Sequence, residues 1–230
     1  MRNLTMNPRR SRGLLGQLLM SGALAAAAIL AIDPAHAADA VSRADMAPDA
    51  LVQSLSSEVL DRVRADLALG NGDSDRLPTV LAETIGPYFD FERMMQLSVG
   101  QNSWRSATAD QQQALMHEFR TMLLHIYGSA LSQVTDHRIK MRAFRAQPGD
   151  IDVTVRTQVA ASAGDPIQLD YRLERADAGW KIYDVIILGV SLVGNFRSSF
   201  AREIHQNGID GLVKALDDRN KQFAASSDKS

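Results

Sequence analysis

The chain has 230 residues, of which 45% are hydrophobic and 23% charged, and its formal net charge is −2. This composition is typical of one globular domain with its own hydrophobic core, and it excludes a disordered or fibrous protein. The absence of cysteine excludes disulfides, thiol catalysis and cysteine-ligated metals, and the slightly acidic balance argues against a nucleic-acid partner.

The first 37 residues have the pattern of a secretory signal peptide. Four arginines precede an uncharged run over residues 13–32, and small residues follow that end in a cleavage pattern at Ala37. We therefore expect export to the periplasm with cleavage after Ala37, and an uncleaved anchor helix is the alternative. The Arg9-Arg10 pair leaves the twin-arginine route open beside the Sec route. The exported chain would carry 21 Lys and Arg against 26 Asp and Glu.

Apolar periodicity predicts that the next part of the chain is helical. After a linker over residues 38–47, Leu and Val side chains recur every four residues and predict an amphipathic helix that ends at Gly70. A second helical region begins near Pro78 and is broken at Gly86-Pro87, and a short helix follows over residues 91–99.

The best-marked helix begins at a capping box formed by Thr108 and Gln111. Apolar residues then recur at spacings of three and four, which is the period of one helix face. These residues are Leu115, Phe119, Met122, Ile126 and Ala130.

The period changes to two after this helix and predicts four strands. Apolar and polar residues alternate in "HRIKMRAF", "DIDVTVRTQV" and "IQLDYRLER", and a fourth strand is expected over residues 180–186. The connections hold Pro, Gly and Asp as hairpin loops do, so the strands should form an antiparallel meander. Helices are expected again over residues 191–205 and 208–218. The expected fold is α+β, with helices packed on one face of a curved four-stranded antiparallel sheet.

The stretch "DVIILGVSLVGNFRSSF" is too apolar for a surface loop and too short to cross a membrane. We interpret it as the end of the last strand, a turn at Gly189, and a helix that Ser191 caps. Such an elbow would close one end of the space between the sheet and the helices.

The same stretch also carries a family resemblance. The run "WKIYDVIILGVSLVGNFRSSF", the later "NGIDGL", the earlier "FDFERM" and Trp104 resemble the MlaC family, also called the toluene-tolerance auxiliary proteins, over roughly residues 50–220. Leu188 and Phe196 depart from the polar or acidic residue and the tyrosine that are usual there in the family.

The resemblance implies a periplasmic phospholipid-binding protein that is not an enzyme and holds no cofactor beyond its lipid cargo. It would shuttle phospholipid between an outer-membrane lipoprotein complex and an inner-membrane ABC transporter complex, and so maintain outer-membrane lipid asymmetry. The domains would be a signal peptide (1–37), a linker (38–47), a lipid-binding α+β domain (48–220) and a polar C-terminal tail (221–230).

A lipid carrier needs a hollow core. A strand of eight residues spans about 26 Å, enough to lie along one acyl chain, and exposing a sixteen-carbon chain to water costs roughly 13 kcal/mol. We expect an apolar cavity lined from the helices, the strands and the elbow. The predicted lipid-binding residues are Met94, Phe119, Met122, Ile126, Met141, Val153, Val155, Leu169, Tyr171, Ile182, Val185, Ile187, Val190, Val193 and Phe196.

Other interpretations remain open. Periodicity alone favours a filled core over a cavity. A small periplasmic enzyme acting on an apolar substrate, or a carrier of a hopanoid-type lipid, are the alternative functions. Two acidic pairs, Asp90 with Glu92 and Asp150 with Asp152, are interpreted as helix and turn residues rather than catalytic groups. The histidines lack the spacing of a helical zinc site, so we expect neither a metal site nor catalytic residues.

A cationic row on the first strand has two interpretations. It consists of Arg138, Lys140 and Arg142, and Arg145 follows it. Such a row is most often a solvated strand face, and the alternative is a surface that guides docking to an acidic partner.

Overall fold

The computed structural model describes residues 43, 45–68, 76–131, 138–160 and 165–227. The predicted signal peptide and six of the ten residues of the predicted linker, 38–42 and 44, lie outside the described residues. No helix in the part of the chain that the structure describes is long and apolar enough to cross a membrane.

The predicted helices are present, and one further short helix was not predicted. Asp90 caps α4 by accepting a hydrogen bond from the backbone N–H of Arg93 at 2.8 Å, and the short helix α5 carries Trp104. The capping box before α6 is confirmed, because the Thr108 backbone N–H donates to Gln111 Oε1 and the Gln111 N–H donates to Thr108 Oγ1. The helices are α2 (Pro48–Ala68), α3 (Arg76–Thr84), the 3-10 turn η1 (Gly86–Tyr88), α4 (Phe91–Val99), α5 (Gln101–Ser106), α6 (Ala109–Leu131) and α7 (Leu192–Ser227).

The last helix, α7, has a break inside it. Gly208 has φ 74°, a left-handed conformation that interrupts the helical backbone, so the predicted break at this glycine is confirmed. The helix then continues to Ser227, through residues that the sequence had indicated as part of a polar tail.

The sheet is an antiparallel meander in the order β1-β2-β3-β4-β5, so the predicted number of four strands was wrong. The fifth strand arises at the elbow, where Leu188 (φ 51°) and Gly189 (φ 84°) are both left-handed and make a tight two-residue turn. Val190 and Ser191 therefore fold back and pair with β4 before α7 begins. The strands are β1 (Arg138–Met141), β2 (Asp152–Ala160), β3 (Ile167–Ala176), β4 (Gly179–Ile187) and β5 (Val190–Ser191).

The first turn of α7 is held by two side chains of this elbow. The Gly194 N–H donates to Ser191 Oγ at 2.9 Å, which confirms Ser191 as the cap. The Ser191 hydroxyl in turn donates to Asp184 of β4, and the Val193 N–H donates to the other oxygen of the same carboxylate. The end of the sheet and the start of α7 are thereby joined through one buried acidic side chain.

An irregularity in β4 changes which residues face the helices. Leu173 pairs with Ile182 and Arg172 pairs with Asp184, so Tyr183 is an extra residue on its strand. Ile182 and Val185, three positions apart, consequently belong to the same hydrophobic cluster, whereas Tyr183 belongs to another.

Ile151 also departs from the predicted alternation, because it precedes β2 and is 71% exposed.

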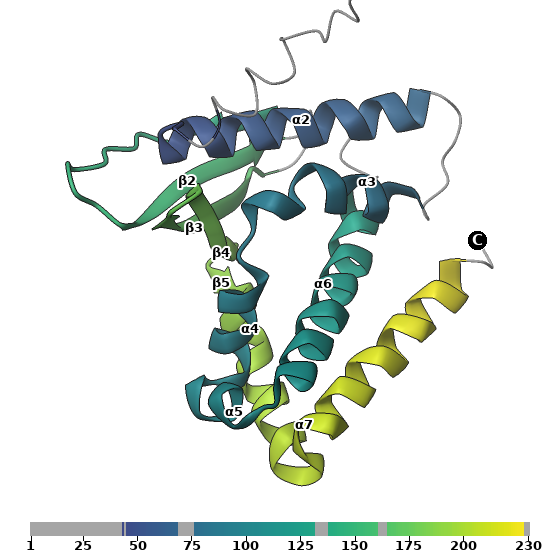
Figure 1. Cartoon of the computed structure of the whole chain (residues 1–230). Coiled ribbons are helices and arrows are strands. Elements are labelled where there is room, and N and C mark those ends of the chain that lie inside the picture. The colour runs from purple at the N-terminus through teal and green to yellow at the C-terminus, as the bar shows by residue number, and fades with distance from the viewer. Residues whose placement is uncertain (1–42, 44, 69–75, 132–137, 161–164, 228–230) are drawn as a thin grey trace, which may run out of the picture. The chain divides into compact units, whose positions relative to one another are not determined.

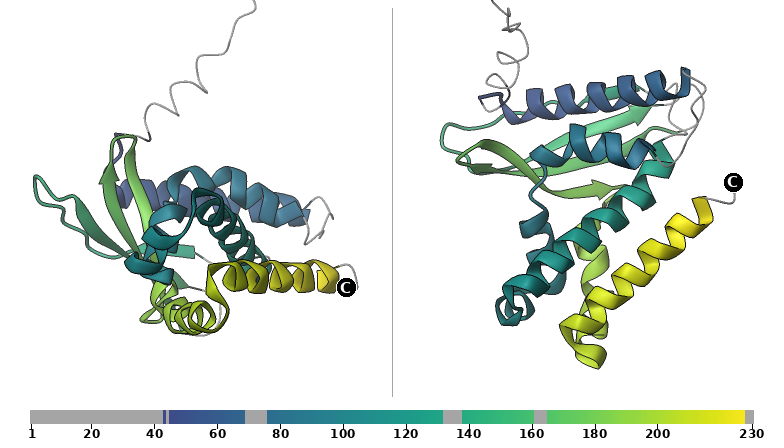
Figure 2. Two further views of the ribbon diagram at one scale, coloured as in Figure 1. Left: turned by 60° about the horizontal axis from the view of Figure 1, so that its bottom comes forward. Right: turned by 45° about the vertical axis from the view of Figure 1, so that its right-hand side comes forward.

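Two large hydrophobic clusters make up most of the core. One lies among α4, α5, α6 and α7, and the other lies between α2 and the sheet. Figure 1 shows α2 extended across the strands and α6 beside α7. Figure 2 (left) shows α2, α3 and α6 on one side of the sheet, so the α+β class is confirmed and these helices share one face.

Candidate ligand pocket

A pocket of about 310 Å³ lies between α2 and the inner face of the sheet. Helices α2, α3, α4 and α6 form one wall, and β1 to β4 form the other. Its volume is at the lower end of the range for small-molecule sites. Nearly all of its lining side chains are aliphatic or aromatic, so the pocket is suited to an apolar ligand.

The pocket lining is most exposed to solvent at the end of the sheet that carries the β4–β5 turn. Along β4 the lining residues become more exposed, from Ile182 at 1% to Val185 at 8% and then to Ile187, which is only partly buried. Leu169 pairs with Ile187 and is also partly buried. Beyond Ile187, Leu188 is 67% exposed. We call this end the pocket mouth.

Three hydroxyl groups from the described residues interrupt the apolar lining, on Ser56 of α2, Tyr127 of α6 and Tyr171 of β3. Burial raises the pKa of Tyr171 to about 12, and the Ser56 hydroxyl opposes this rise only in part. Burial also raises the pKa of Tyr127. Both phenols are therefore protonated at neutral pH and keep a hydrogen that they can donate.

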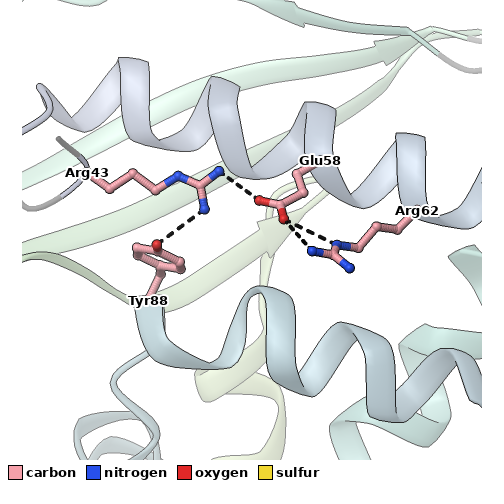
Figure 3. Close-up of polar contacts among 4 residues, drawn as sticks. All are labelled: Arg43, Glu58, Arg62 and Tyr88. Carbon is pink, nitrogen blue, oxygen red and sulfur yellow. Dashed lines mark hydrogen bonds and ion pairs between the residues drawn. The ribbon is translucent and has the colours of Figure 1, made fainter. Parts of the chain in front are cut away.

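A polar bridge joins two of the helical elements that form the pocket wall (Figure 3). Arg43 Nη2 donates to Glu58 of α2 at 2.8 Å, and Arg43 Nη1 donates to the Tyr88 hydroxyl of η1 at 3.3 Å. Arg62 donates to the other oxygen of Glu58 at 2.9 Å. Because Val59 of α2 and Phe89 next to η1 both line the pocket, the bridge holds two sides of the helical wall together.

The polar bridge also sets the charge state of its carboxylate. Partial burial acts to raise the pKa of Glu58, but the hydrogen bonds from Arg62 and Arg43 outweigh burial. The pKa of Glu58 therefore falls below its usual value, and the group is ionised at neutral pH.

The structure brings six of the fifteen predicted lipid-binding residues together in the pocket. They come from α4, β3 and β4: Met94, Leu169, Tyr171, Ile182, Val185 and Ile187. The other nine do not line the pocket. The hydrophobic cluster among α4 to α7 buries Phe119, Met122 and Val193, and Ile126 and Phe196 pack against it. The cluster between α2 and the sheet buries Val153 and Val155, and Met141 packs against it. Val190 is 56% exposed.

Sequence reasoning missed most of the helical wall. The α2 residues Val52, Leu55, Ser56, Val59 and Leu60 line the pocket, as do Leu81 and Ile85 in and just after α3. The four-residue period of α2 was the available signal, because it marks the buried face of the helix. This period does not indicate whether the space opposite that face is filled.

The acidic side chains that resembled catalytic pairs serve the fold. Asp90 caps α4, and Asp150 accepts a hydrogen bond from the Gln147 N–H within a turn. Asp152 accepts a hydrogen bond from the Tyr183 hydroxyl at 2.6 Å. Within the described ranges, no group of three or more His, Cys, Asp or Glu side chains is arranged to hold a metal ion.

Comparison with known proteins gives a family match over most of the chain. Residues 53–218 match the model of a protein family described as MlaC protein. Toluene tolerance protein ttg2D of Pseudomonas putida is 26% identical over 170 residues, which cover 74% of this chain and 78% of that protein. The intermembrane phospholipid transport system binding protein MlaC of Haemophilus influenzae is 20% identical over 176 residues, covering 75% and 82%.

A solved structure is also similar to this chain. It is a phospholipid-binding protein from Ralstonia solanacearum in complex with a phospholipid, and it superposes with a TM-score of 0.73 at 35% sequence identity. The match covers 78% of this chain and 99% of the other.

Proposed function

Because this chain belongs to the MlaC protein family, we propose that it is a phospholipid carrier of the periplasm. The observation that carries the proposal is the apolar pocket between α2 and the sheet, which is open at one end. The similar protein from Ralstonia solanacearum, which was solved with a phospholipid, supports the same cargo.

The acyl region of the lipid would lie in the pocket with the headgroup at the pocket mouth. Each methylene sheltered in the pocket avoids a free-energy cost of about 0.8 kcal/mol for exposure to water. The pocket would therefore lower the cost of moving a lipid through an aqueous compartment. Among the described residues, the lining offers no carboxylate, imidazole or cationic side chain. Affinity would therefore come mainly from the acyl region rather than from the charge of the headgroup.

We further infer where the carrier acts. The signal-peptide pattern that ends at Ala37 supports export, and the family supports a partnership with a transport system. The carrier would pass phospholipid between an outer-membrane lipoprotein complex and an inner-membrane ABC transporter complex, and this traffic would maintain the lipid asymmetry of the outer membrane.

The test is to identify what the natively purified protein contains. The exported protein is released from the periplasm without detergent, its organic extract is analysed by mass spectrometry, and the lipid is quantified per protein. We expect phospholipid in about equimolar amount. A lipid-free extract from folded protein contradicts the proposal, and a hopanoid-type lipid in place of phospholipid would replace the proposed cargo.

The same sample separates a carrier from an enzyme. Purified protein is incubated with phospholipid vesicles, and lysophospholipid and free fatty acid are measured over hours. A carrier leaves the lipid intact. Products that accumulate in proportion to protein concentration would favour the enzyme.

A further inference from the structure

The pocket contains one pair of polar groups that face each other across its two walls. Ser56 lies on α2 and Tyr171 on β3, and both residues line the pocket from opposite walls. In the sheet, Tyr171 pairs with Val155 on one side and with Val185 on the other. The pair therefore lies over the middle of the sheet, and apolar side chains surround it.

Burying two hydroxyls in an apolar pocket has a free-energy cost unless each finds a hydrogen-bond partner. Each hydroxyl carries one hydrogen, so the pair carries two. Even a hydrogen bond between the two would use only one of these hydrogens, which leaves the other to donate. The other lining side chains in the described part of the chain are apolar apart from Tyr127, so the ligand is the natural source of an acceptor.

The depth of the pair matches one part of a phospholipid. Tyr171 is two residues further into the sheet than Leu169 at the pocket mouth, which corresponds to about 7 Å. With the headgroup outside the mouth and the acyl region inside, the first polar atoms below the mouth are the ester oxygens that join the chains to glycerol. An ester carbonyl is a hydrogen-bond acceptor and offers no donor, which suits a pair that has one free hydrogen.

We propose that the hydroxyls of Ser56 and Tyr171 bind an ester carbonyl oxygen of the lipid, so that the pocket selects ester-linked lipids over ether-linked lipids. This inference rests on the proposed function and names the linkage that the same pocket recognises. The apolar side chains would determine how much chain is sheltered, and the hydroxyl pair would determine at which depth the glycerol ester lies.

The test is a competition between two lipids that differ only in their linkage. Vesicles contain equal amounts of a dipalmitoyl phosphatidylethanolamine and its dihexadecyl ether counterpart. The protein exchanges its lipid with the vesicles and is separated from them, and mass spectrometry gives the ratio of bound ester lipid to bound ether lipid. We expect roughly a two- to tenfold preference for the ester, the size of one neutral hydrogen bond.

Two variants assign the preference to the pair, and one serves as a matched control. Tyr171→Phe and Ser56→Ala each remove one hydroxyl and should lower the preference toward one, with total bound lipid and melting temperature nearly unchanged. Tyr183→Phe makes the same chemical change on β4 outside the pocket, where the phenol donates a hydrogen bond to Asp152. We expect it to keep the preference of the unmodified chain.

The outcomes separate this inference from the proposed function. Equal loading of both lipids by the unmodified protein overturns the ester recognition and leaves the carrier intact. Loading of neither lipid overturns both. A preference that survives in Tyr171→Phe, or that disappears equally in Tyr183→Phe, overturns the assignment to Ser56 and Tyr171.

Discussion

The buried carboxylate of Asp184 in β4 accepts a hydrogen bond at 2.6 Å from the hydroxyl of Ser191, which itself caps α7. The other carboxylate oxygen accepts from the Val193 N–H at 3.2 Å, and Asp184 is only 2% exposed. One acidic side chain thus satisfies two donors at the start of α7, where the backbone N–H groups lack partners within the helix.

Replacing Asp184 by alanine should destabilise the fold by about 2–4 kcal/mol. The change leaves the Ser191 hydroxyl and the Val193 N–H without their acceptor in a buried place, and hydrogen bonds to charged groups are the stronger ones. Ser191→Ala should cost about 1 kcal/mol through loss of the cap. Denaturant unfolding of the two single variants and the double variant gives the coupling energy between Asp184 and Ser191. The free energy of unfolding should fall less in the double variant than the sum of the two single losses. Additive losses would contradict a shared network.

Leu188→Asn should stabilise the protein by about 0.5–1 kcal/mol. Leu188 has φ 51°, a left-handed conformation that costs leucine roughly 1–2 kcal/mol and that asparagine adopts more readily. The side chain is 67% exposed, so little packing is lost. Thermal and denaturant unfolding measure the change. Leu97→Asn is the matched control, because Leu97 is an exposed leucine in α4 and should lose stability. Equal losses at both positions would contradict a strained turn.

The polar bridge predicts a pH dependence through Glu58. A carboxyl group whose pKa is lower in the folded protein than its usual 4.5 contributes stability above that value. This contribution is lost as the pH falls through the lower folded pKa. Glu58→Gln should therefore cost about 1 kcal/mol at pH 7, and the difference from the unmodified protein should shrink below about pH 4.

The measurement is urea unfolding of both proteins between pH 7 and pH 3. Glu83→Gln is the control, because Glu83 is an exposed residue of α3 outside the polar bridge. The difference in free energy of unfolding between Glu58→Gln and the unmodified protein should change over this pH range. A constant difference would show that the charge of Glu58 does not stabilise the bridge.

Bulk at the pocket mouth and bulk in the packed cluster should have different effects. Leu169→Trp places a large side chain where lipid is proposed to enter, so bound lipid should fall while the melting temperature changes by a degree or two. Val155→Trp adds bulk at a residue that is 0% exposed and does not line the pocket. It should cost about 1–3 kcal/mol through strain.

Lipid per protein and melting temperature are measured on the same samples. Lys140→Trp, at an exposed position of β1, is the control and should change neither quantity. Unchanged lipid content in a stable Leu169→Trp protein would remove Leu169 from the lipid site.

The local elements of this fold were predictable from the sequence because their causes are local. The period of four in α2, the capping box of Thr108 with Gln111, and the alternation in β2 and β3 depend on residues a few positions apart. The family resemblance rests on "WKIYDVIILGVSLVGNFRSSF" and its companion motifs, and it named the family that residues 53–218 then matched. The fifth strand was not predictable in this way, because leucine at 188 disfavours the left-handed turn that produces it.

The pocket itself was decided only by the tertiary structure. Periodicity shows that α2 and β3 each have an apolar face, but it does not show whether the two faces meet or leave a space between them. Ser56 and Tyr171, 115 positions apart in the chain, both line that space, while Val155, one strand away from Tyr171, is fully packed. The extra residue Tyr183 turns Ile182 and Val185 to the same side. Which apolar residues line a hollow depends on the distance between walls that are remote in sequence, and a one-dimensional pattern does not contain that distance.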